Sequence, residues 1–259
     1  MKRLPVIIAA LFLLMPAMLK AQAGIDVSRF QDSINWKRVA KHSTVEFAYI
    51  KATEGASITD PMYKYNVKKA REAGLLVGSY HVYSSRTTAY QQFANFKKAL
   101  GKTKQDLVPV LDIEATHCHK LYMKRVDKLL ELMEKEYGAK PMIYTSEKLY
   151  KTHFNIKKYK KYHFFIANYK REPAVAYTLW QYTQRGKLKG IAGFVDLSKF
   201  NRKYTVENIK IKKKTVEAEP AEKPSQTNQP AKAVTAQGQA NAKPAAKPAS
   251  KPAAKPAAK

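Results

Sequence analysis

The sequence has few of the residues that build small cross-linked scaffolds. Its 259 residues include one cysteine, Cys118, so no disulfide can form within the chain. This excludes a disulfide-stapled fold and a zinc finger built on cysteines. Acidic residues are also scarce, with 20 Asp and Glu against 48 Lys and Arg, which gives a net charge of +28. Such an excess indicates a polyanionic partner, such as nucleic acid, a membrane surface or an acidic cell envelope.

Long apolar runs are absent after the N-terminus. There, a positively charged start precedes a short apolar run (residues 4–19) and the small-x-small sequence Ala21-Gln22-Ala23. This order is typical of a signal peptide, which we predict over residues 1–23 with cleavage near Ala23. A membrane anchor is the alternative, but the run is short for a bilayer span. We therefore predict an exported protein, periplasmic or secreted, without a stable membrane span.

The C-terminal segment contains no aromatic residue. Residues 215–259 hold seven of the 13 prolines and repeat the sequence Lys-Pro-Ala-Ala, first at residues 243–246. This composition cannot bury enough apolar surface to offset the entropy of ordering, so we predict a disordered Lys/Pro/Ala-rich tail. The tail would either tether the protein to an anionic surface or keep it soluble, and the sequence favours neither reading.

Residues 24–214 are predicted to form the folded domain. After three net positive charges are assigned to the leader and four to the tail, this segment retains +21 of the +28. Helical spacing of apolar residues predicts helices at residues 60–73, 90–100, 120–137 and 147–150. Eight runs rich in β-branched and aromatic residues predict strands. These runs are Gly24–Val27, Phe47–Ala52, Leu76–Tyr83, Val108–Ala115, Pro141–Thr145, His163–Tyr169, Tyr177–Tyr182 and Phe194–Phe200.

The alternation of strands and helices predicts a barrel. Strands that alternate with helices pair in parallel, and eight of them suggest closure. The stretch from Phe164 to Tyr182 holds two strands and only a turn at Pro173, which we interpret as too short for a parallel crossover. We therefore predict an α/β fold: an irregular β/α barrel of about eight strands with few helices. Its first half would be regular βα units and its last strands partly antiparallel.

Five of the scarce acidic residues lie at or near strand ends, where β/α barrels place their active sites. They are Asp26, Glu54, Asp112, Glu114 and Asp196. Asp112 and Glu114 are two residues apart, so they would share a face with their α-carbons roughly 6.5–7 Å apart. Their repulsion should raise the pKa of one of them. Such a pair suits glycoside hydrolysis, although D-x-E also marks metal sites and ordinary strand ends.

Aromatic residues accompany the carboxylates at the strand ends. They are Tyr80, Tyr83, Tyr144, Tyr169, Trp180 and Tyr182. Flat rings stack on the apolar faces of sugars, although packing inside the barrel would claim several of these residues. His81 would either contact substrate or belong to the barrel wall. The sequence His117-Cys118-His119 is interpreted as a surface turn, because alternating loop residues do not make a tetrahedral zinc site.

Several short motifs occur in one order along residues 24–200. They are Gly24–Ser28, Phe47–Gly55, Ala73–Leu75, Val77–His81, Leu111–Glu114, Ala167–Tyr169, Leu179–Tyr182 and Val195–Leu197. Each is weak alone, but in this order the set is specific, and it resembles glycoside hydrolase family 25, the Chalaropsis-type lysozymes. Ser198 stands where that family often has asparagine, a minor departure because Asp196 is kept.

The resemblance implies an activity and roles for the acids. It implies hydrolysis of the β-1,4 bond between N-acetylmuramic acid and N-acetylglucosamine in peptidoglycan, without metal or cofactor. Glu114 would be the general acid/base, and Asp112 would support the transition state, by steering the substrate's acetamido group or by another route. Asp26 and Asp196 would be supporting carboxylates. The predicted substrate contacts are Glu54, Tyr80, His81, Tyr83, Tyr144, Tyr169, Trp180 and Tyr182.

We therefore predict an exported, monomeric muramidase that acts on peptidoglycan glycan strands. Its basic domain and tail would be attracted to anionic envelope polymers. Basic runs at residues 157–161 and 210–214 would indicate nucleic acid in a cytosolic protein. Behind an export signal we favour a solvated face or attraction to the wall, and predict no nucleic-acid partner. The alternatives are a non-catalytic envelope-binding protein and a polyanion-binding protein driven by charge.

Overall fold

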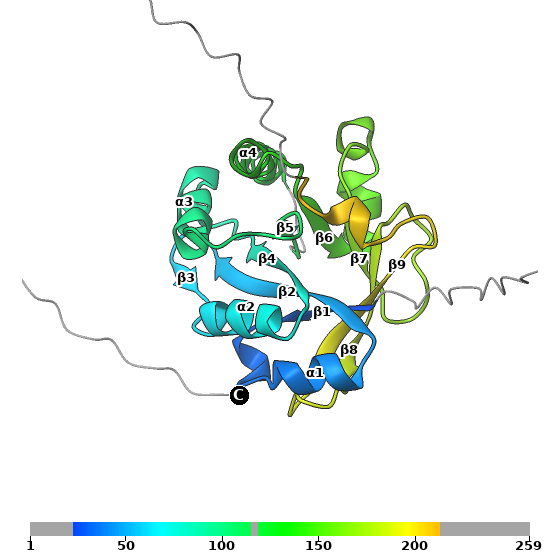
Figure 1. Cartoon of the computed structure of the whole chain (residues 1–259). Helices are drawn as coiled ribbons and strands as arrows, with labels where there is room; N and C mark the ends of the chain where they lie inside the picture. Colours follow the sequence, from blue (N-terminus) through cyan, green and yellow to red (C-terminus); the bar gives the residue numbers. More distant parts are fainter. Residues whose placement is uncertain (1–22, 115–118, 213–259) are drawn as a thin grey trace, which may run out of the picture. The chain divides into compact units, whose positions relative to one another are not determined.

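Nine strands form a single sheet that closes into a barrel. The computed structural model describes residues 23–114 and 119–212, so residues 1–22 of the predicted leader, the predicted tail, His117 and Cys118 lie outside the described residues. The strands are β1 (Ala23–Val27), β2 (Val45–Glu54), β3 (Ile58–Thr59), β4 (Leu76–Val82), β5 (Val110–Asp112), β6 (Met142–Ser146), β7 (Phe164–Ala167), β8 (Leu179–Gly186) and β9 (Val195–Phe200). Eight of them surround the barrel, and the two-residue β3 extends β2 as a short hairpin (Figure 1).

Among the eight strands that surround the barrel, the direction changes only at β9. Strands β1, β2, β4, β5, β6, β7 and β8 pair in parallel, whereas β9 runs antiparallel to both of its neighbours, β8 and β1. The predicted irregular barrel with partly antiparallel last strands is therefore confirmed. The short β3 was not predicted.

The predicted antiparallel pairing within residues 164–182 is wrong, because β7 and β8 are parallel. Residues 168–178 connect the two strands without a helix. Eleven extended residues can span roughly 36 Å, well beyond the roughly 13 Å length of the four-residue β7. A plain loop can therefore return the chain to the start of β8, and no helical crossover is needed.

Helices cover the barrel mainly along its first strands. They are α1 (Trp36–His42), α2 (Tyr63–Glu72), α3 (Ala89–Leu100), α4 (Lys120–Tyr137) and α5 (Glu147–Leu149), with short helical turns η1 (Arg29–Gln31), η2 (Tyr150–Phe154), η3 (Lys157–Tyr159) and η4 (Val206–Ile209). Helices α2 to α4 lie where the apolar spacing predicts them. Helix α1 was not predicted, since its seven residues bury only Trp36 and Val39. No helix in the described ranges is long and apolar enough to cross a membrane.

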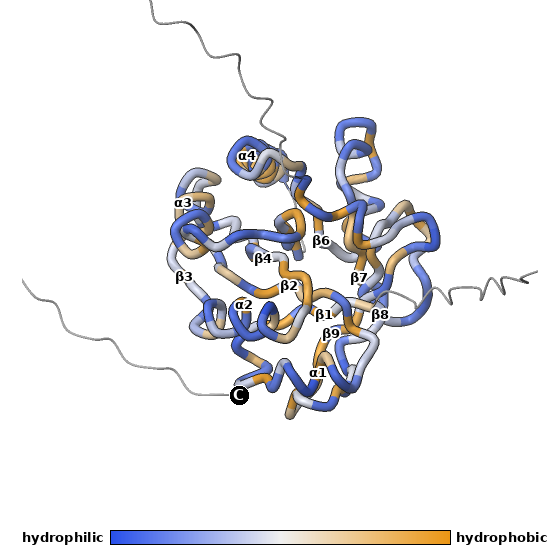
Figure 2. The backbone as a smooth tube through the Cα atoms, in the orientation of Figure 1, coloured by the Kyte–Doolittle hydropathy of each residue, from blue (hydrophilic) through white to orange (hydrophobic). Residues whose placement is uncertain are grey.

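Alternating side chains create two apolar layers, one outside and one inside the barrel. Side chains such as Ile50 and Val77 form the outer layer under the helices, whereas Phe47 and Tyr49 belong to the inner layer. Gly24 makes room inside, because a Cβ there would come within 2.1 Å of the Phe47 ring. Figure 2 shows the apolar stretches following the strands, while the outward parts of the helices are hydrophilic.

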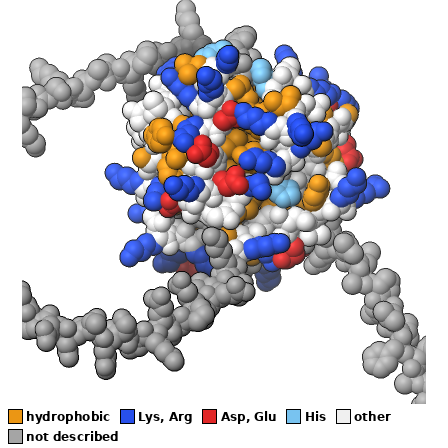
Figure 3. Space-filling view, turned by 90° about the horizontal axis from the view of Figure 1, so that it is seen from above, with side chains coloured by type: hydrophobic (Ala, Val, Ile, Leu, Met, Phe, Trp, Pro, Cys, Tyr) orange, Lys and Arg blue, Asp and Glu red, His pale blue; other side chains and the backbone are white. Residues whose placement is uncertain are grey.

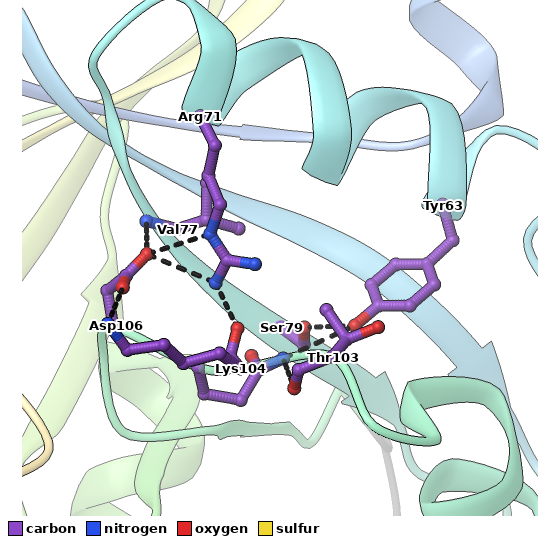
Figure 4. A network of polar contacts seen from close by, with 8 residues as sticks. Tyr63, Arg71, Val77, Ser79, Thr103, Lys104 and Asp106 are labelled. Atoms are coloured by element: carbon purple, nitrogen blue, oxygen red, sulfur yellow. Dashed lines mark hydrogen bonds and ion pairs between the residues drawn. The ribbon is translucent and has the colours of Figure 1, made fainter.

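The N-terminal end of the barrel is packed and pinned by polar contacts. The Asp106 carboxylate accepts hydrogen bonds from the Arg71 guanidinium and from the Val77 backbone N–H, all at 3.1 Å (Figure 4). Nearby, Val206 and Ile209 of η4 join the inner apolar layer. This end is therefore filled, and the open space of the barrel lies at the opposite end.

Candidate active site

A cavity of about 360 Å³ lies at the C-terminal ends of the strands. Seven of the twelve predicted site residues line it. They are Asp26, Glu54, Tyr80, Asp112, Glu114, Tyr144 and Asp196. Five of these seven are acids, although Lys and Arg dominate the face of the molecule seen in Figure 3. The structure thus gathers scarce carboxylates in one place on a basic protein.

Asp112 and Glu114 reach the cavity from the end of β5. The residue between them, Ile113, is buried in the outer layer, and its N–H donates to the carbonyl oxygen of Tyr144 (2.9 Å). This bond keeps the chain extended past the strand end, so both acids line the same cavity. Glu114 is exposed, whereas Asp112 is only 9% exposed.

The environment of Asp112 disfavours its charged form. Burial, followed by the charges of Glu114 and Asp26, raises the pKa of Asp112 well above its ordinary value. Lys51, which forms an ion pair with Glu54 (2.7 Å), opposes this shift. The Asp112 atom Oδ1 has no hydrogen-bond partner within the described part of the chain. It is thus a buried acceptor at the cavity wall that a bound molecule can satisfy.

Asp26 and Asp196 form a second acidic pair. They lie directly opposite each other on the neighbouring strands β1 and β9, and their carboxyl groups are in hydrogen-bond contact. Burial and the charge of Asp196 raise the pKa of Asp26 well above its ordinary value. The pKa of Asp196 is also raised, mainly by burial. Both shifts favour the protonated form, and one proton held between the two carboxyl groups would satisfy this contact.

Gln181 on β8 holds the second pair in place. Its Nε2 donates to both carboxylate oxygens of Asp26, at 2.9 and 3.0 Å. Its Oε1 accepts hydrogen bonds from the hydroxyls of Tyr144 (2.8 Å) and Tyr169 (2.6 Å). Because both hydroxyls donate to the oxygen, the amide can turn only its nitrogen toward Asp26. Burial raises the pKa of Tyr169 to about 12, so this tyrosine remains a donor at neutral pH.

Tyr169 lies at the edge of this arrangement rather than among the residues that line the cavity. Tyr169 is 46% exposed, although its hydroxyl is bonded to Gln181. It comes from the loop between β7 and β8. Neighbouring Asn168 is held by Glu147, whose carboxylate accepts from the Asn168 amide at 2.5 Å.

His81 and Tyr83, two predicted substrate contacts, lie on the outer face of the barrel. The His81 ring is fully buried between the hydroxyl of Thr53 (2.7 Å) and the amide oxygen of Gln92 (3.2 Å). Tyr83 packs edge-on against Tyr122 of α4, with ring centroids 4.8 Å apart. Because Tyr80 points into the barrel, strand alternation turns His81 outward.

Trp180 and Tyr182 also lie outside the cavity. The Trp180 Nε1 donates to the carbonyl oxygen of Asn168 (2.7 Å), and its ring meets Tyr182 edge-on at 5.9 Å. The ammonium group of Lys199 lies over both rings. Gln181 between them faces inward, which sends its two aromatic neighbours to the outer face. They therefore hold the β7–β8 loop and the β8–β9 pair from outside.

Several residues that line the cavity were not predicted. The main ones are Lys51, Gln181, Tyr49, Phe165 and the η1 residues Phe30 and Gln31. Gln181 belongs to a motif noted in the sequence. The alternation of side chains along that strand could have identified it as an inward-facing residue. Glu54 reaches the cavity because the register shifts between Lys51 and Thr53, which sequence periodicity does not reveal. Within the described residues, no three His, Cys, Asp or Glu side chains are grouped to hold a metal ion.

Comparisons with known proteins agree with this geometry. Residues 25–191 match the model of the glycosyl hydrolases family 25. The chain is 33% identical over 207 residues to lysozyme M1 of Streptomyces globisporus, covering 72% of this chain and 70% of that protein. It is 39% identical over 197 residues to the uncharacterized protein YegX of Escherichia coli, covering 72% and 71%.

Solved structures share the fold. The bacterial lysozyme from Streptomyces coelicolor has a TM-score of 0.65 at 29% identity, covering 73% of this chain and 95% of that one. A family 25 glycosyl hydrolase from Bacillus anthracis has a TM-score of 0.63 at 30% identity, covering 72% and 93%. Both cover nearly all of the neighbouring chain, so the barrel is matched as a whole.

Proposed function

Because this chain belongs to glycosyl hydrolase family 25, we propose that it is a lysozyme that cleaves the β-1,4 bond between N-acetylmuramic acid and N-acetylglucosamine in peptidoglycan. It is a glycoside hydrolase. The observation that supports its chemistry best is the pairing of exposed Glu114 with buried Asp112 in one cavity.

Glu114 serves as the general acid and then the general base. Its exposed carboxyl group stands at the cavity, where it can give a proton to the glycosidic oxygen as the bond from C1 breaks. After the leaving sugar departs, the same group takes a proton from the water that attacks C1. One carboxyl group thus supplies and recovers a single proton over the cycle.

Asp112 steers the substrate's own acetamido group. Its Oδ1, which has no hydrogen-bond partner among the described residues, accepts the acetamido N–H, and this turns the acetamido oxygen toward C1. That oxygen forms a bond to C1 as the glycosidic bond breaks, and water later displaces it. The raised pKa of Asp112 suits this role, since a buried carboxyl group that resists ionisation gains most from a hydrogen bond to its charged form.

Asp26 and Asp196 adjust the charge of the site. By sharing a proton they add fewer than two negative charges beside Asp112, and the bond from Gln181 fixes Asp26. Tyr80, Tyr144 and Glu54 line the cavity and contact the sugars, as does Tyr169 from its edge. His81, Tyr83, Trp180 and Tyr182 support the barrel from outside.

The sequence also motivates a location for this activity. We propose that the leader, residues 1–23, directs export, and that the monomeric basic domain is drawn to the anionic wall outside the cytoplasm. The tail, residues 215–259, adds positive charge to the same attraction.

Digestion of purified peptidoglycan tests the function directly. The products are reduced with borohydride and identified by mass spectrometry, and we expect new reducing ends of N-acetylmuramic acid. New reducing ends of N-acetylglucosamine would contradict the stated bond. Binding to the sacculi without any cleavage would instead favour the non-catalytic envelope-binding alternative, and salt-sensitive DNA binding without cleavage would favour a polyanion-binding protein.

A further inference from the structure

An exposed aromatic and cationic surface borders the acidic cavity. We call it the cationic ledge and define it by Arg29, Phe30, Arg185, Lys187 and Phe194. Phe30 is 72% exposed, more than any other large apolar side chain in the described ranges, and Phe194 is 45% exposed. Phe30 also lines the cavity, so the ledge continues directly from the site.

Hydrogen bonds fix the backbone that carries the exposed rings of the ledge. In η1, the Ser28 N–H donates to Gln31 Oε1 (2.9 Å) and the Phe30 N–H to Ser28 Oγ (3.2 Å). The Arg29 N–H donates to the buried carboxylate of Asp60 (2.9 Å). Gln31 Nε2 then donates to the carbonyl oxygen of Phe194 (3.1 Å), which ties the two parts of the ledge together.

The cations of the ledge lie over its own aromatic rings. The guanidinium groups of Arg29 and Arg185 are each 5.2 Å from the ring centroids of Phe30 and Phe194, respectively, and Lys187 Nζ is 5.5 Å from the Phe194 ring. Within the described part of the chain, none of the three forms an ion pair with a carboxylate. Their charge is therefore available to a ligand.

The ledge lies above the mouth of the barrel. Strand β8 runs parallel to β7, so its C-terminal end points the same way as the mouth. Arg185 is four residues beyond Gln181, which places it roughly 13 Å further along the strand. The β8–β9 hairpin thus carries the cations from the acidic cavity toward solvent. A substrate that is uncharged at the cleaved bond and anionic some residues away would fit this separation of charge.

We propose that the cationic ledge binds the carboxylate-bearing peptide stem of peptidoglycan while the glycan lies in the cavity. The proposal rests on the proposed function and names the part of the substrate that gives the enzyme its preference. The stem is attached to muramic acid next to the cleaved bond, and its free carboxylates lie a few residues out along an extended peptide. The rings of Phe30 and Phe194 contact its apolar parts, and the three cations bind its carboxylates.

The test compares two forms of one substrate. Peptidoglycan with native stems is hydrolysed beside the same material whose free carboxylates have been converted to amides with carbodiimide and ammonia. We expect wild-type protein to show a kcat/KM about fivefold to tenfold higher on the native form, because exposed ion pairs each contribute little. The preference should shrink in about 1 M salt, where charges are screened within about 3 Å.

Two matched double variants locate the effect. In the variant R185Q/K187Q we expect the ratio of kcat/KM on native and amidated substrate to fall to near one. The control K160Q/K203Q removes the same charge from exposed lysines outside the cavity and the ledge, and should keep the wild-type ratio.

The outcomes separate this proposal from the function on which it rests. Cleavage of both substrates with the wild-type ratio unchanged in R185Q/K187Q would overturn the ledge proposal alone. A wild-type ratio near one would do the same. Absence of cleavage of either substrate by the wild-type protein would overturn the proposed function and, with it, the ledge.

Discussion

Strands β4 and β5 are each followed by a long helix, and β2 by the short β3 and then α2, whereas β7 is followed by a plain loop and β8 by a hairpin. We refer to the first group with α2, α3 and α4 as the helix-backed half, and to β7, β8, β9 and β1 as the open half. In the helix-backed half, apolar side chains under the helices fix the strands. Fewer helices pack against the strands of the open half, and hydrogen bonds and ion pairs hold its loops instead.

The two halves contribute different things to the site. The helix-backed half supplies Asp112 and Glu114, which act on the bond in our proposal. The open half supplies Asp26, which is bonded to both Gln181 and Asp196, and in the same proposal these residues set the charge around the reacting groups. Asp112 and Glu114 thus lie in the half that apolar packing fixes. Asp26, Asp196 and Gln181 lie in the half that polar contacts fix. Variants in each half should therefore fail in different ways.

The largest effect is expected for Glu114→Gln in the helix-backed half. The amide cannot donate a proton as an acid, so kcat should fall by about a thousandfold or more. The fold should persist because Glu114 is exposed, as circular dichroism and thermal melting would show. Glu131→Gln, at an exposed residue of α4 that forms an ion pair with Lys128, is the matched control. A Glu114→Gln rate within tenfold of wild type would remove this residue from the acid role.

Asp112→Asn is expected to lower kcat by about a hundredfold while stabilising the fold. The folded pKa of Asp112 is raised above its unfolded value, so wild-type stability falls as pH rises from about 4 through that raised pKa. Asparagine has no charge to bury, so the variant should gain about 1–3 kcal/mol at pH 7 and nothing at pH 3. Urea unfolding at both pH values measures this. Equal stability at pH 7 would mean that Asp112 is ionised at no cost.

The open half should respond through binding rather than through chemistry. Glu147 accepts from Lys151 (2.6 Å), Asn168 (2.5 Å) and Arg171 (3.3 Å), and so fastens the loop that carries Tyr169. Glu147→Gln weakens these contacts, so we expect KM to rise about fivefold with kcat changed less. The Glu131→Gln control should leave both unchanged. A fall in kcat alone would show that the loop serves the reaction step and not substrate binding.

The same glutamate predicts an acid limit for the open half. Its contacts with Lys151, then Asn168 and Arg171, lower the pKa of Glu147 to about 2. The stability that it contributes is therefore present above about pH 4.5 and is lost as pH falls toward 2. The protection factors of the amides of residues 168–178, which compare each rate with the intrinsic rate at the same pH, should fall over this range in wild-type protein and already be low at neutral pH in Glu147→Gln.

The position of the acids in the cavity followed from sequence, since charged residues at the ends of apolar runs are conspicuous and barrel geometry brings strand ends together. The choice among aromatic residues followed less well. Tyr80 and Tyr144 line the cavity. Trp180 and Tyr182 flank the inward-facing Gln181 on β8, so their side chains point to the outer face. Gln181 carries no charge to mark it, and its role depends on bonds to β1, β6 and the β7–β8 loop that no local pattern encodes.

The topology of the open half was the least predictable part of the fold. A connection length was used to infer antiparallel pairing between β7 and β8, and the inference was wrong because it assumed that a parallel return requires a helix. The loop at residues 168–178 is instead held by Glu147, from a different segment. Such long-range polar anchors leave no periodic signal, whereas the amphipathic helices α2 to α4 do.

The smallest effect on activity is expected for His81→Phe, on the outer face of the helix-backed half. Its Nε2–H donates to Gln92 Oε1, which also accepts from the Ser84 N–H, so its Nδ1 accepts the Thr53 hydroxyl. Phenylalanine fills similar space but leaves the buried Thr53 hydroxyl without its acceptor and Gln92 Oε1 with one donor fewer, at a cost of about 1–3 kcal/mol. Activity well below the melting temperature should stay within about twofold of wild type, since the ring does not reach the cavity.

The pH dependence of stability distinguishes His81 from Asp112, because the contribution of His81 grows as pH rises above 4 whereas that of Asp112 falls. Burial lowers the pKa of His81 to about 4, so the neutral ring contributes stability that is fully present above about pH 6.5 and is lost as pH falls toward 4. His81→Phe should remove this slope and leave the losses caused by Glu147 at lower pH. Melting temperatures of both proteins between pH 4 and 7 measure the difference. A tenfold loss of activity in a fully folded His81→Phe would contradict this expectation. It would show that packing on the outer face is coupled to the cavity through β4.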